Sequence, residues 1–339
     1  MSENNTLNIV NAASKFRQNE DTLKRMAEKC LGKPVWDFHA QELGGGMCNA
    51  VYLIQADRQK YVIKIAPQAE PGVLMRHEEN SLLNEANMLH LLNERLDIPA
   101  PRLIHLDTTR EICGADYFMM SFVEGIPLSS MNPKPTDNEI SRIKRDVGVI
   151  CRKISSIHGN KFGIPALQST HRDNNADFIL LLVEMLLKDA ADANITIPGI
   201  THTGLLALIG ENRSVLNDNV FPRYIHTDTW DGNLMIKDNK LTGLIDYAAV
   251  FCGDELMHHD FHDFGELNPA FTSGYGKTQF THSEKIRISV YKIWQRLGMI
   301  VECGYRKYDD PNMYSWVHGE FSREVEHLAD LISLKNQNG

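Results

Sequence analysis

The stretch HTDTWDGNLMI at residues 226–236 decides which fold this chain is expected to adopt. It gathers two carboxylates and a carboxamide and then turns apolar. A second apolar run, GLIDYAAV at 243–250, follows with Asp246 in its middle. Burying such polar groups beside strand-like segments costs on the order of several kcal/mol unless each group is paired or binds a metal. The sequence therefore predicts a site in which these side chains have specific partners.

The spacing H-x-D-x-x-x-x-N within this stretch suits the transfer of a phosphoryl group. Asp228 would orient the acceptor hydroxyl, and Asn233 with Asp246 would supply the hard oxygen ligands that Mg²⁺ requires. The alternative is an Asp- and Asn-rich turn between two strands, held by side-chain to backbone hydrogen bonds. The strand, short turn and apolar-apolar-Asp that follow favour the first interpretation.

Phosphoryl transfer also needs a site that binds the nucleotide phosphates, and the first part of the chain offers candidate residues for it. Gly44, Gly45 and Gly46 lie between two predicted strands, where backbone amides can approach phosphate oxygens. Taken alone, such a glycine run is equally typical of a flexible hairpin.

A lysine inside an apolar strand is the second candidate residue of this phosphate-binding site. Lys64 in the run VIKI either lies on a solvated face or reaches into a cleft toward phosphates. The helix that follows offers three glutamates as counter-ions, namely Glu78, Glu79 and Glu85. We predict Glu85, because it lies within the apolar stripe of the helix and so faces the body of the protein.

Two regions of different character follow one another along the chain. The first predicts a hairpin at 50–56 and 61–66, a helix at 73–96 and strands at 99–107 and 117–125. The second is mainly helical with a short β-type block at 224–250, and its helices are expected at 137–158, 173–191, 203–217, 283–304 and 313–335.

The expected organisation is therefore an α+β chain with two lobes. Residues 1–37 would form a helical extension with a helix over 7–30, residues 38–122 a small β-rich N-lobe that binds nucleotide, and residues 123–339 a larger, mainly helical C-lobe.

In this order, the features resemble the aminoglycoside phosphotransferase and choline kinase-like family, which shares the protein-kinase fold. The resemblance covers roughly residues 38–280 and extends to the segments IPAP at 98–101, FG at 162–163 and GD at 253–254. Trp230 beside Asp231 resembles the fructosamine kinase branch of that family. Thr227 and Trp230 depart from the more usual residues of the motif, and neither change removes a catalytic group.

The resemblance implies a role for each residue of the site. Asp228 would accept or orient the proton of the acceptor hydroxyl, and Asn233 and Asp246 would hold Mg²⁺. Lys64, fixed by Glu85, would contact the α- and β-phosphates of ATP or GTP. The backbone near Ser121 and Val123 would receive the nucleotide base, and His226 would pack behind the loop.

An acidic segment follows the apolar run and could line the acceptor site. Residues 246–266 contain no Lys or Arg and, besides Asp246, hold the carboxylates Asp254, Glu255, Asp260, Asp263 and Glu266. With Asp231 these residues are candidate contacts for a polyhydroxylated or amine-bearing, cationic acceptor. The alternative is that Asp254 caps a helix and the others are solvated.

Three histidines within the acidic segment raise the question of a metal. His258 and His262 are four residues apart and would share a face of a helix, with His259 between them. Without a Glu in the H-E-x-x-H position or a distant third ligand, we expect a pH-sensitive or substrate-facing cluster rather than zinc.

The overall composition narrows the class of partner and the compartment. The formal net charge of −9 argues against a nucleic-acid or acidic-membrane surface, and dispersed cysteines indicate reduced thiols in a cytoplasmic protein. The longest apolar run, FILLLVEMLL at 178–187, is too short to span a membrane. The oligomeric state, monomer or homodimer, is open.

The predicted function is that of a small-molecule kinase with an alcohol group as acceptor, of the aminoglycoside phosphotransferase type. Fold analogy leaves the acceptor open. A glycated-amine kinase and a metabolic kinase of the choline, homoserine or methylthioribose type remain alternatives. A non-catalytic nucleotide-binding protein on the same fold is a further one.

Overall fold

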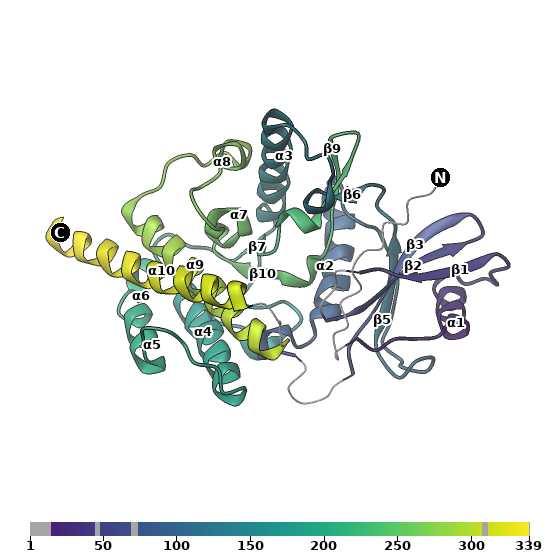
Figure 1. The fold of residues 1–339 in the computed structure, drawn as a ribbon, viewed down its shortest axis with the longest axis horizontal. Helices are drawn as coiled ribbons and strands as arrows, with labels where there is room; N and C mark the ends of the chain where they lie inside the picture. The colour runs from purple at the N-terminus through teal and green to yellow at the C-terminus, as the bar shows by residue number, and fades with distance from the viewer. Residues whose placement is uncertain (1–14, 45–47, 69–73, 307–310, 339) are drawn as a thin grey trace.

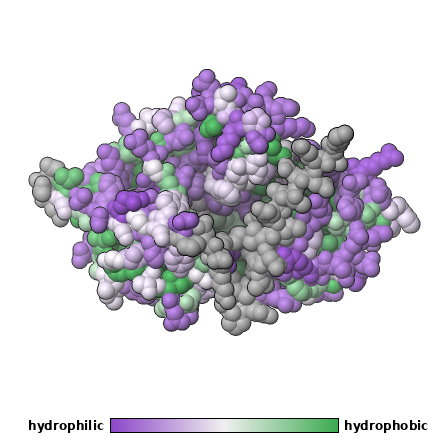
Figure 2. Space-filling model, in the orientation of Figure 1, coloured by the Kyte–Doolittle hydropathy of each residue, from purple (hydrophilic) through white to green (hydrophobic). Residues whose placement is uncertain are grey.

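The structure is a computed structural model that describes residues 15–44, 48–68, 74–306 and 311–338. Figure 1 shows two lobes, an antiparallel sheet with two flanking helices at one end and a larger helical assembly at the other. Most of the face seen in Figure 2 is hydrophilic, and its apolar residues form small separate patches.

The N-lobe is built on a sheet of five antiparallel strands in the order β1-β2-β3-β5-β4. The strands are β1 (Phe38–Glu42), β2 (Ala50–Ala56), β3 (Gln59–Ile65), β4 (Leu103–Asp107) and β5 (Tyr117–Ser121). The turn between β2 and β3 has positive φ at Asp57 and Arg58, the geometry of a tight hairpin whose twist matches its strands. The hairpin is confirmed, with its second strand beginning two residues before the predicted start.

Alternation along the strands divides the N-lobe core into two layers. Ile63 and Met119 face one side, where they pack with α1 (Glu20–Leu31). Val62 and Met120 face the other side, where they pack with α2 (Ser81–Arg95) and join the core of the C-lobe. The α2 side of the sheet is therefore continuous with the second lobe, and the α1 side is not.

The C-lobe is mainly helical and encloses two small sheets. Its helices are α3 (Asp137–Ser155), α4 (Asn175–Asp192), α5 (His202–Gly210), α6 (Arg213–Leu216), α7 (His259–His262), α8 (Pro269–Tyr275), α9 (His282–Tyr305) and α10 (Pro311–Asn338). One sheet joins β6 (Ile126–Pro127), β8 (Leu234–Lys237) and β9 (Lys240–Leu244), and the other pairs β7 (Arg223–His226) with β10 (Val250–Gly253). The long helix α10 runs across α9 toward the far edge of the lobe (Figure 1).

Three predicted helices differ from those in the structure. The helix expected at 203–217 is two helices, α5 and α6, separated at Glu211 and Asn212. The helix expected at 73–96 begins only at Ser81, after the 3₁₀ turn η1 (Arg76–Glu78). Of the helix expected at 7–30, residues 7–14 lie outside the described part, and the helix begins at Glu20, where Asn19 caps it.

The segment between β5 and β6 joins the lobes. A Cβ atom on Gly125 would lie 2.7 Å from the carbonyl oxygen of Ile236, so this position requires glycine for the linker to approach β8. The division of the chain at 37/38 and 122/123 stays a prediction.

No helix in the described ranges is long and apolar enough to cross a membrane.

Candidate active site

The loop between β7 and β8 brings the predicted catalytic residue and a predicted metal ligand together. The side-chain amide Nδ2 of Asn233 donates to the backbone carbonyl of Asp228 at 2.8 Å and to its Oδ2 at 2.8 Å. Because both amide hydrogens point toward Asp228, the Oδ1 atom of Asn233 faces the other way. One side chain thus bonds both the backbone and the carboxylate of Asp228, and its remaining Oδ1 atom is the predicted metal ligand.

Two neutral histidines support this loop from behind. His226 Nδ1 accepts a hydrogen bond from the backbone N–H of Asp228, and His258 Nδ1 accepts one from the backbone N–H of His226. Burial lowers the pKa of His226 to about 4 and that of His258 to about 3. Both rings therefore stay uncharged at neutral pH and act as acceptors for the loop backbone.

Asp246 follows β9 in a strained backbone conformation. Its φ of 64° and ψ of 71° lie in the left-handed region, which costs a non-glycine residue roughly 1–3 kcal/mol. The backbone N–H of Ile245 donates to the carbonyl of Asn233 at 3.0 Å, which holds Asp246 next to the catalytic loop. The Asp246 side chain is 39% exposed and so remains open to a ligand.

Lys64 connects the two lobes at the site. Its Nζ lies 2.8 Å from both carboxylate oxygens of Glu85 and 3.2 Å from Oδ1 of Asp246. Burial alone would lower the pKa of Lys64, but the charges of Asp246 and Glu85 outweigh it and raise this pKa above its usual value. Burial would also raise the pKa of Asp246, and the charge of Lys64 reverses this and lowers it. Lys64 and Asp246 are therefore both ionised at neutral pH.

The helix that carries Glu85 is bonded to the C-lobe through the preceding residue. Asn84 is buried, and its Nδ2 donates to the carbonyls of Ala248 and Val250 at 2.9 Å each. Its Oδ1 accepts from the backbone N–H of Ala166 at 3.1 Å. Sequence reasoning missed Asn84, although an asparagine beside Glu85 in an apolar stripe was a signal that a buried partner exists.

The donor set fits a magnesium ion. The carboxylate of Asp246 and the Oδ1 of Asn233 are hard oxygen ligands, and Mg²⁺ in phosphoryl-transfer sites typically takes one or two such groups together with phosphates and water. Within the described ranges, no group of three or more His, Cys, Asp and Glu side chains is arranged to hold a metal ion.

The carboxyl of Asp228 has a pKa above the usual value for an aspartate. Burial raises its pKa to about 6, and the charge of Asp246 adds to the effect, whereas the hydrogen bond from Asn233 opposes it. A carboxyl with a pKa near neutrality is suited to accept and release a proton during a reaction.

The predicted nucleotide contacts are only partly described. Gly44 lies at the bend after β1, and Gly45 and Gly46 lie outside the described residues. Ser121 ends β5, and its Oγ accepts from the backbone N–H of Arg102 at 2.8 Å. Val123 packs on Gly243, where a Cβ atom would lie 2.5 Å from the Val123 Cγ1 atom. The linker thus packs directly against β9 at Gly243.

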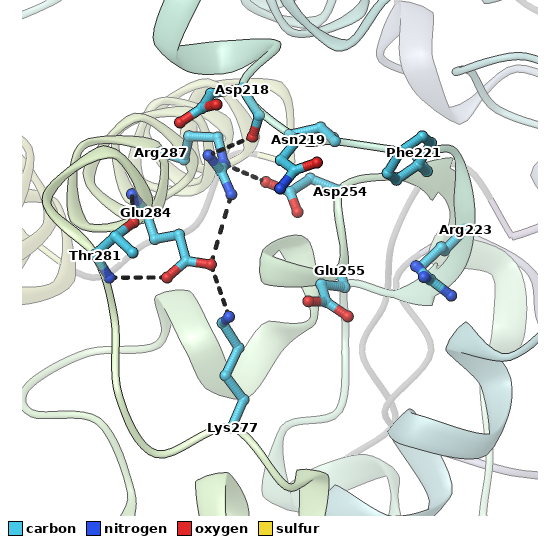
Figure 3. A pocket seen from close by; sticks show the side chains of 11 residues that line it. Asp218, Asn219, Phe221, Arg223, Asp254, Glu255, Lys277, Thr281, Glu284 and Arg287 are labelled. Carbon is cyan, nitrogen blue, oxygen red and sulfur yellow. Dashed lines mark hydrogen bonds and ion pairs between the residues drawn. The ribbon is translucent and has the colours of Figure 1, made fainter.

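Two of the predicted acceptor contacts line a different pocket. In the β7–β10 pair, His226 lies opposite Val250 and Arg223 opposite Gly253, so Asp254 and Glu255 follow the end of β10 that is distant from Asp228. They line a cavity of about 350 Å³ with Arg223 and Arg287 (Figure 3). The structure therefore does not bring Asp254 and Glu255 together with the catalytic loop.

Asp254 has structural partners in this pocket. It is buried, accepts from Arg287 Nε and from the Tyr291 hydroxyl at 2.7 Å each, and caps the 3₁₀ turn η6 (Glu255–Met257). The capping role is the alternative that the sequence left open for this residue.

The remaining carboxylates of the acidic segment have different surroundings. Asp260 is buried and accepts from the Thr229 hydroxyl at 2.6 Å. Lys144 Nζ lies 3.3 Å from Asp260 and 3.0 Å from the half-exposed Asp231. Asp263 is partly exposed beside His259, and Glu266 is exposed. Cations that are distant in the sequence therefore neutralise part of the acidic segment.

The three histidines of the acidic segment do not converge on one point. His258 contacts Ser155 Oγ at 2.7 Å and the catalytic loop, whereas His262 Nε2 contacts the carbonyl of Met257 at 2.9 Å. His259 lies 3.6 Å from Asp263. Their partners are protein groups, and His258 supports the catalytic loop.

Comparison with known proteins identifies the architecture. A family model described as "Phosphotransferase enzyme family" matches residues 39–265. A candidate fructosamine-3-kinase from Haemophilus somnus superposes with a TM-score of 0.66 at 15% identity over 90% of this chain and 97% of that one. The aminoglycoside phosphotransferase APH(2″)-IIa, solved with streptomycin and ATP, superposes with a TM-score of 0.58 at 14% identity over 91% and 97%. The predicted bilobal, protein-kinase-like α+β fold is confirmed.

A curated relative matches over a shorter segment. An aligned segment of 124 residues is 27% identical to an Arabidopsis thaliana protein assigned as acyl-CoA dehydrogenase IBR3. This segment covers 34% of the present chain. The match spans 15% of the length of that protein.

Proposed function

The chain belongs to the phosphotransferase enzyme family, and from this premise we propose that it transfers the γ-phosphoryl group of ATP or GTP to a hydroxyl of a small acceptor. The observation that carries the proposal is the contact of Lys64 with both Glu85 and Asp246, next to the Asn233–Asp228 pair. These residues come from both lobes and meet where phosphates and an acceptor would meet. A non-catalytic role has no such observation in its favour.

Lys64 would neutralise phosphate oxygens of the nucleotide. Its ammonium group is held by Glu85 from a helix that is itself bonded to the C-lobe, so the charge is positioned before the nucleotide binds. The glycine run at 44–46 would offer backbone amides to the phosphates, and the backbone at Ser121–Val123 would receive the base. Positioned charges of this kind supply most of the catalysis in phosphoryl transfer.

Asn233 and Asp246 would hold Mg²⁺, which when bound neutralises charge on the transferring phosphoryl group. Asp228 would orient the acceptor hydroxyl and take its proton as the new P–O bond forms and the bond to the leaving nucleoside diphosphate breaks. A pKa of about 6 lets Asp228 be ionised at neutral pH and still accept a proton.

The acceptor belongs, in our proposal, to the polyhydroxylated or amine-bearing class. Asp231 and Asp263, both partly exposed, are the proposed contacts. Because Lys144 neutralises Asp260, and because Asp254 lies away from the catalytic loop, the site has a smaller acidic excess than the sequence suggests. A polyol, or a sugar with one amine, suits this balance better than a polycation.

An acceptor panel tests the proposal. Release of nucleoside diphosphate would be measured with ATP and with GTP in the presence of fructosyl-amines, aminoglycosides, choline, homoserine and nucleoside-derived sugars. We expect Mg²⁺-dependent release with at least one polyhydroxylated acceptor, and ³¹P NMR should detect a phosphate monoester. Nucleotide binding without transfer to any acceptor would favour the non-catalytic alternative.

A further inference from the structure

A lysine of helix α3 lies beneath the catalytic loop. Lys144 is 8% exposed, and its Nζ lies 3.0 Å from Oδ1 of Asp231 and 3.3 Å from Oδ1 of Asp260. Asp231 belongs to the loop itself, between the proposed catalytic Asp228 and the proposed metal ligand Asn233. The three charged residues come from α3, the loop and α7.

Asp260 adds a second connection to the same loop. Its Oδ2 accepts from the hydroxyl of Thr229 at 2.6 Å, while its Oδ1 faces Lys144. The loop is thus held at Thr229 through Asp260 and at Asp231 directly. These two positions flank Trp230, whose side chain is 49% exposed.

The arrangement leaves little freedom to the loop residues that follow the two anchors. A Cβ atom on Gly232 would overlap the indole of Trp230, so the ring lies directly on the loop backbone. Asn233 follows at once and bonds both the carbonyl and the carboxylate of Asp228. Any shift of the loop at Asp231 would therefore move both the proposed metal ligand Asn233 and the proposed catalytic Asp228 that it bonds.

Lys144 lies on helix α3, which packs closely against helix α8. Helices α3 and α8 lie side by side (Figure 1), and their backbones approach so closely that a Cβ atom on Gly148 or Gly274 would overlap the opposite helix. Side chains on such packed elements hold a position better than those on loops. Burial alone would lower the pKa of Lys144, but the charges of Asp260 and Asp231 raise it.

We propose that Lys144 is a positioning residue, which acts through Asp231 and through Asp260–Thr229 to fix the loop that carries Asp228 and Asn233. The inference rests on the proposed function for its kinetic consequence, but not for its structural one. In this arrangement one carboxylate oxygen of Asp231 faces Lys144, which limits how Asp231 could contact an acceptor.

The test compares Lys144→Met with Lys144→Arg and with Arg287→Met. Lys144→Met removes the charge and keeps most of the volume, and Lys144→Arg restores a cation. Arg287→Met is the matched control, because it also removes a buried cation from a carboxylate, at the end of β7 distant from the loop. The readouts are hydrogen exchange of residues 226–236, the nucleotide dissociation constant, and kcat with an accepted acceptor.

For Lys144→Met we expect faster exchange within 226–236, a nucleotide dissociation constant near that of the parent, and a kcat lower by about 10- to 100-fold, as misplacement of reacting groups produces. Lys144→Arg should recover part of both effects. Arg287→Met should accelerate exchange around α9 and leave the loop unchanged. If Lys144→Met does not fold, Asp231→Asn removes one anchor and should show the same signature more weakly.

Unchanged exchange of 226–236 in both Lys144→Met and Asp231→Asn would overturn the proposal, as would equal loop exchange in Lys144→Met and Arg287→Met. The exchange readout needs no acceptor, so it remains valid if the parent protein phosphorylates nothing. In that case the proposed function fails while the positioning role of Lys144 is still decided.

Discussion

The ammonium of Lys64 lies 2.8 Å from both carboxylate oxygens of Glu85 and 3.2 Å from Asp246. Lys64 and Glu85 belong to the N-lobe, whereas Asp246 follows a C-lobe strand. The backbone N–H of Tyr247 also donates to Glu85, at 3.3 Å. The buried Lys64–Glu85 ion pair therefore joins the sheet to helix α2, and through Lys64 it also contacts the proposed metal ligand Asp246.

Removing one partner of this pair should destabilise the protein more than removing both. Lys64→Met leaves Glu85 buried and unpaired, which costs about 3–5 kcal/mol, whereas replacing both partners with apolar residues is far less costly. We expect calorimetry to give a lower Tm for Lys64→Met than for the double variant Lys64→Met/Glu85→Leu, with both inactive. A double variant less stable than Lys64→Met would contradict this view of the pair.

The pH dependence of activity should report the carboxyl of Asp228. Its pKa of about 6 means that the ionised form, which accepts the proton, is lost as the pH falls through 6. We expect kcat/KM for the acceptor to decline on the acid side with an apparent pKa near 6. A decline that begins only near pH 4, the range of an ordinary aspartate, would argue against Asp228 as the base.

The same pKa predicts a gain in stability when the charge is removed. The native state raises the pKa of Asp228 from 3.8 to about 6, so it binds this proton more tightly than the unfolded chain does. The stabilisation is present below about pH 4 and is lost as the pH rises through 6. Asp228→Asn should therefore raise the Tm at pH 8 and change it little at pH 4. Equal changes at both values would contradict the shift.

Asp246 should govern the requirement for magnesium. Asp246→Asn removes a charged oxygen ligand, and loss of even a supporting group at a metal site typically costs roughly 10- to 100-fold. We expect the Mg²⁺ concentration for half-maximal activity to rise at least that far, while circular dichroism stays that of the parent. A variant with an unchanged magnesium requirement would show that the ion binds elsewhere.

The sequence was sufficient for the parts of the site whose pattern is local. The spacing of Asp228, Asn233 and Asp246 predicted residues that the structure brings together, and the apolar stripe around Glu85 singled it out from Glu78, which instead pairs with Arg306. In these cases periodicity and spacing carry the geometry.

The partners supplied by distant elements could not be predicted in this way. Lys144 lies 116 residues from Asp260, and nothing in the spacing relates them. Asp254 and Asp260 are close in sequence, yet the first follows the distant end of β10 and the second lies beneath the catalytic loop. The predicted acidic surface failed in part because the cations that neutralise it come from α3 and α9.

The most direct test of the account is transfer of labelled γ-phosphate to the acceptor by the parent and by Asp228→Asn, with Asp238→Asn as a matched control in an exposed turn. We predict parental transfer by the control, and a loss of about 10²- to 10⁴-fold in Asp228→Asn with nucleotide affinity retained. Equal transfer by Asp228→Asn and the parent would contradict the central claim that Asp228 directs the acceptor hydroxyl.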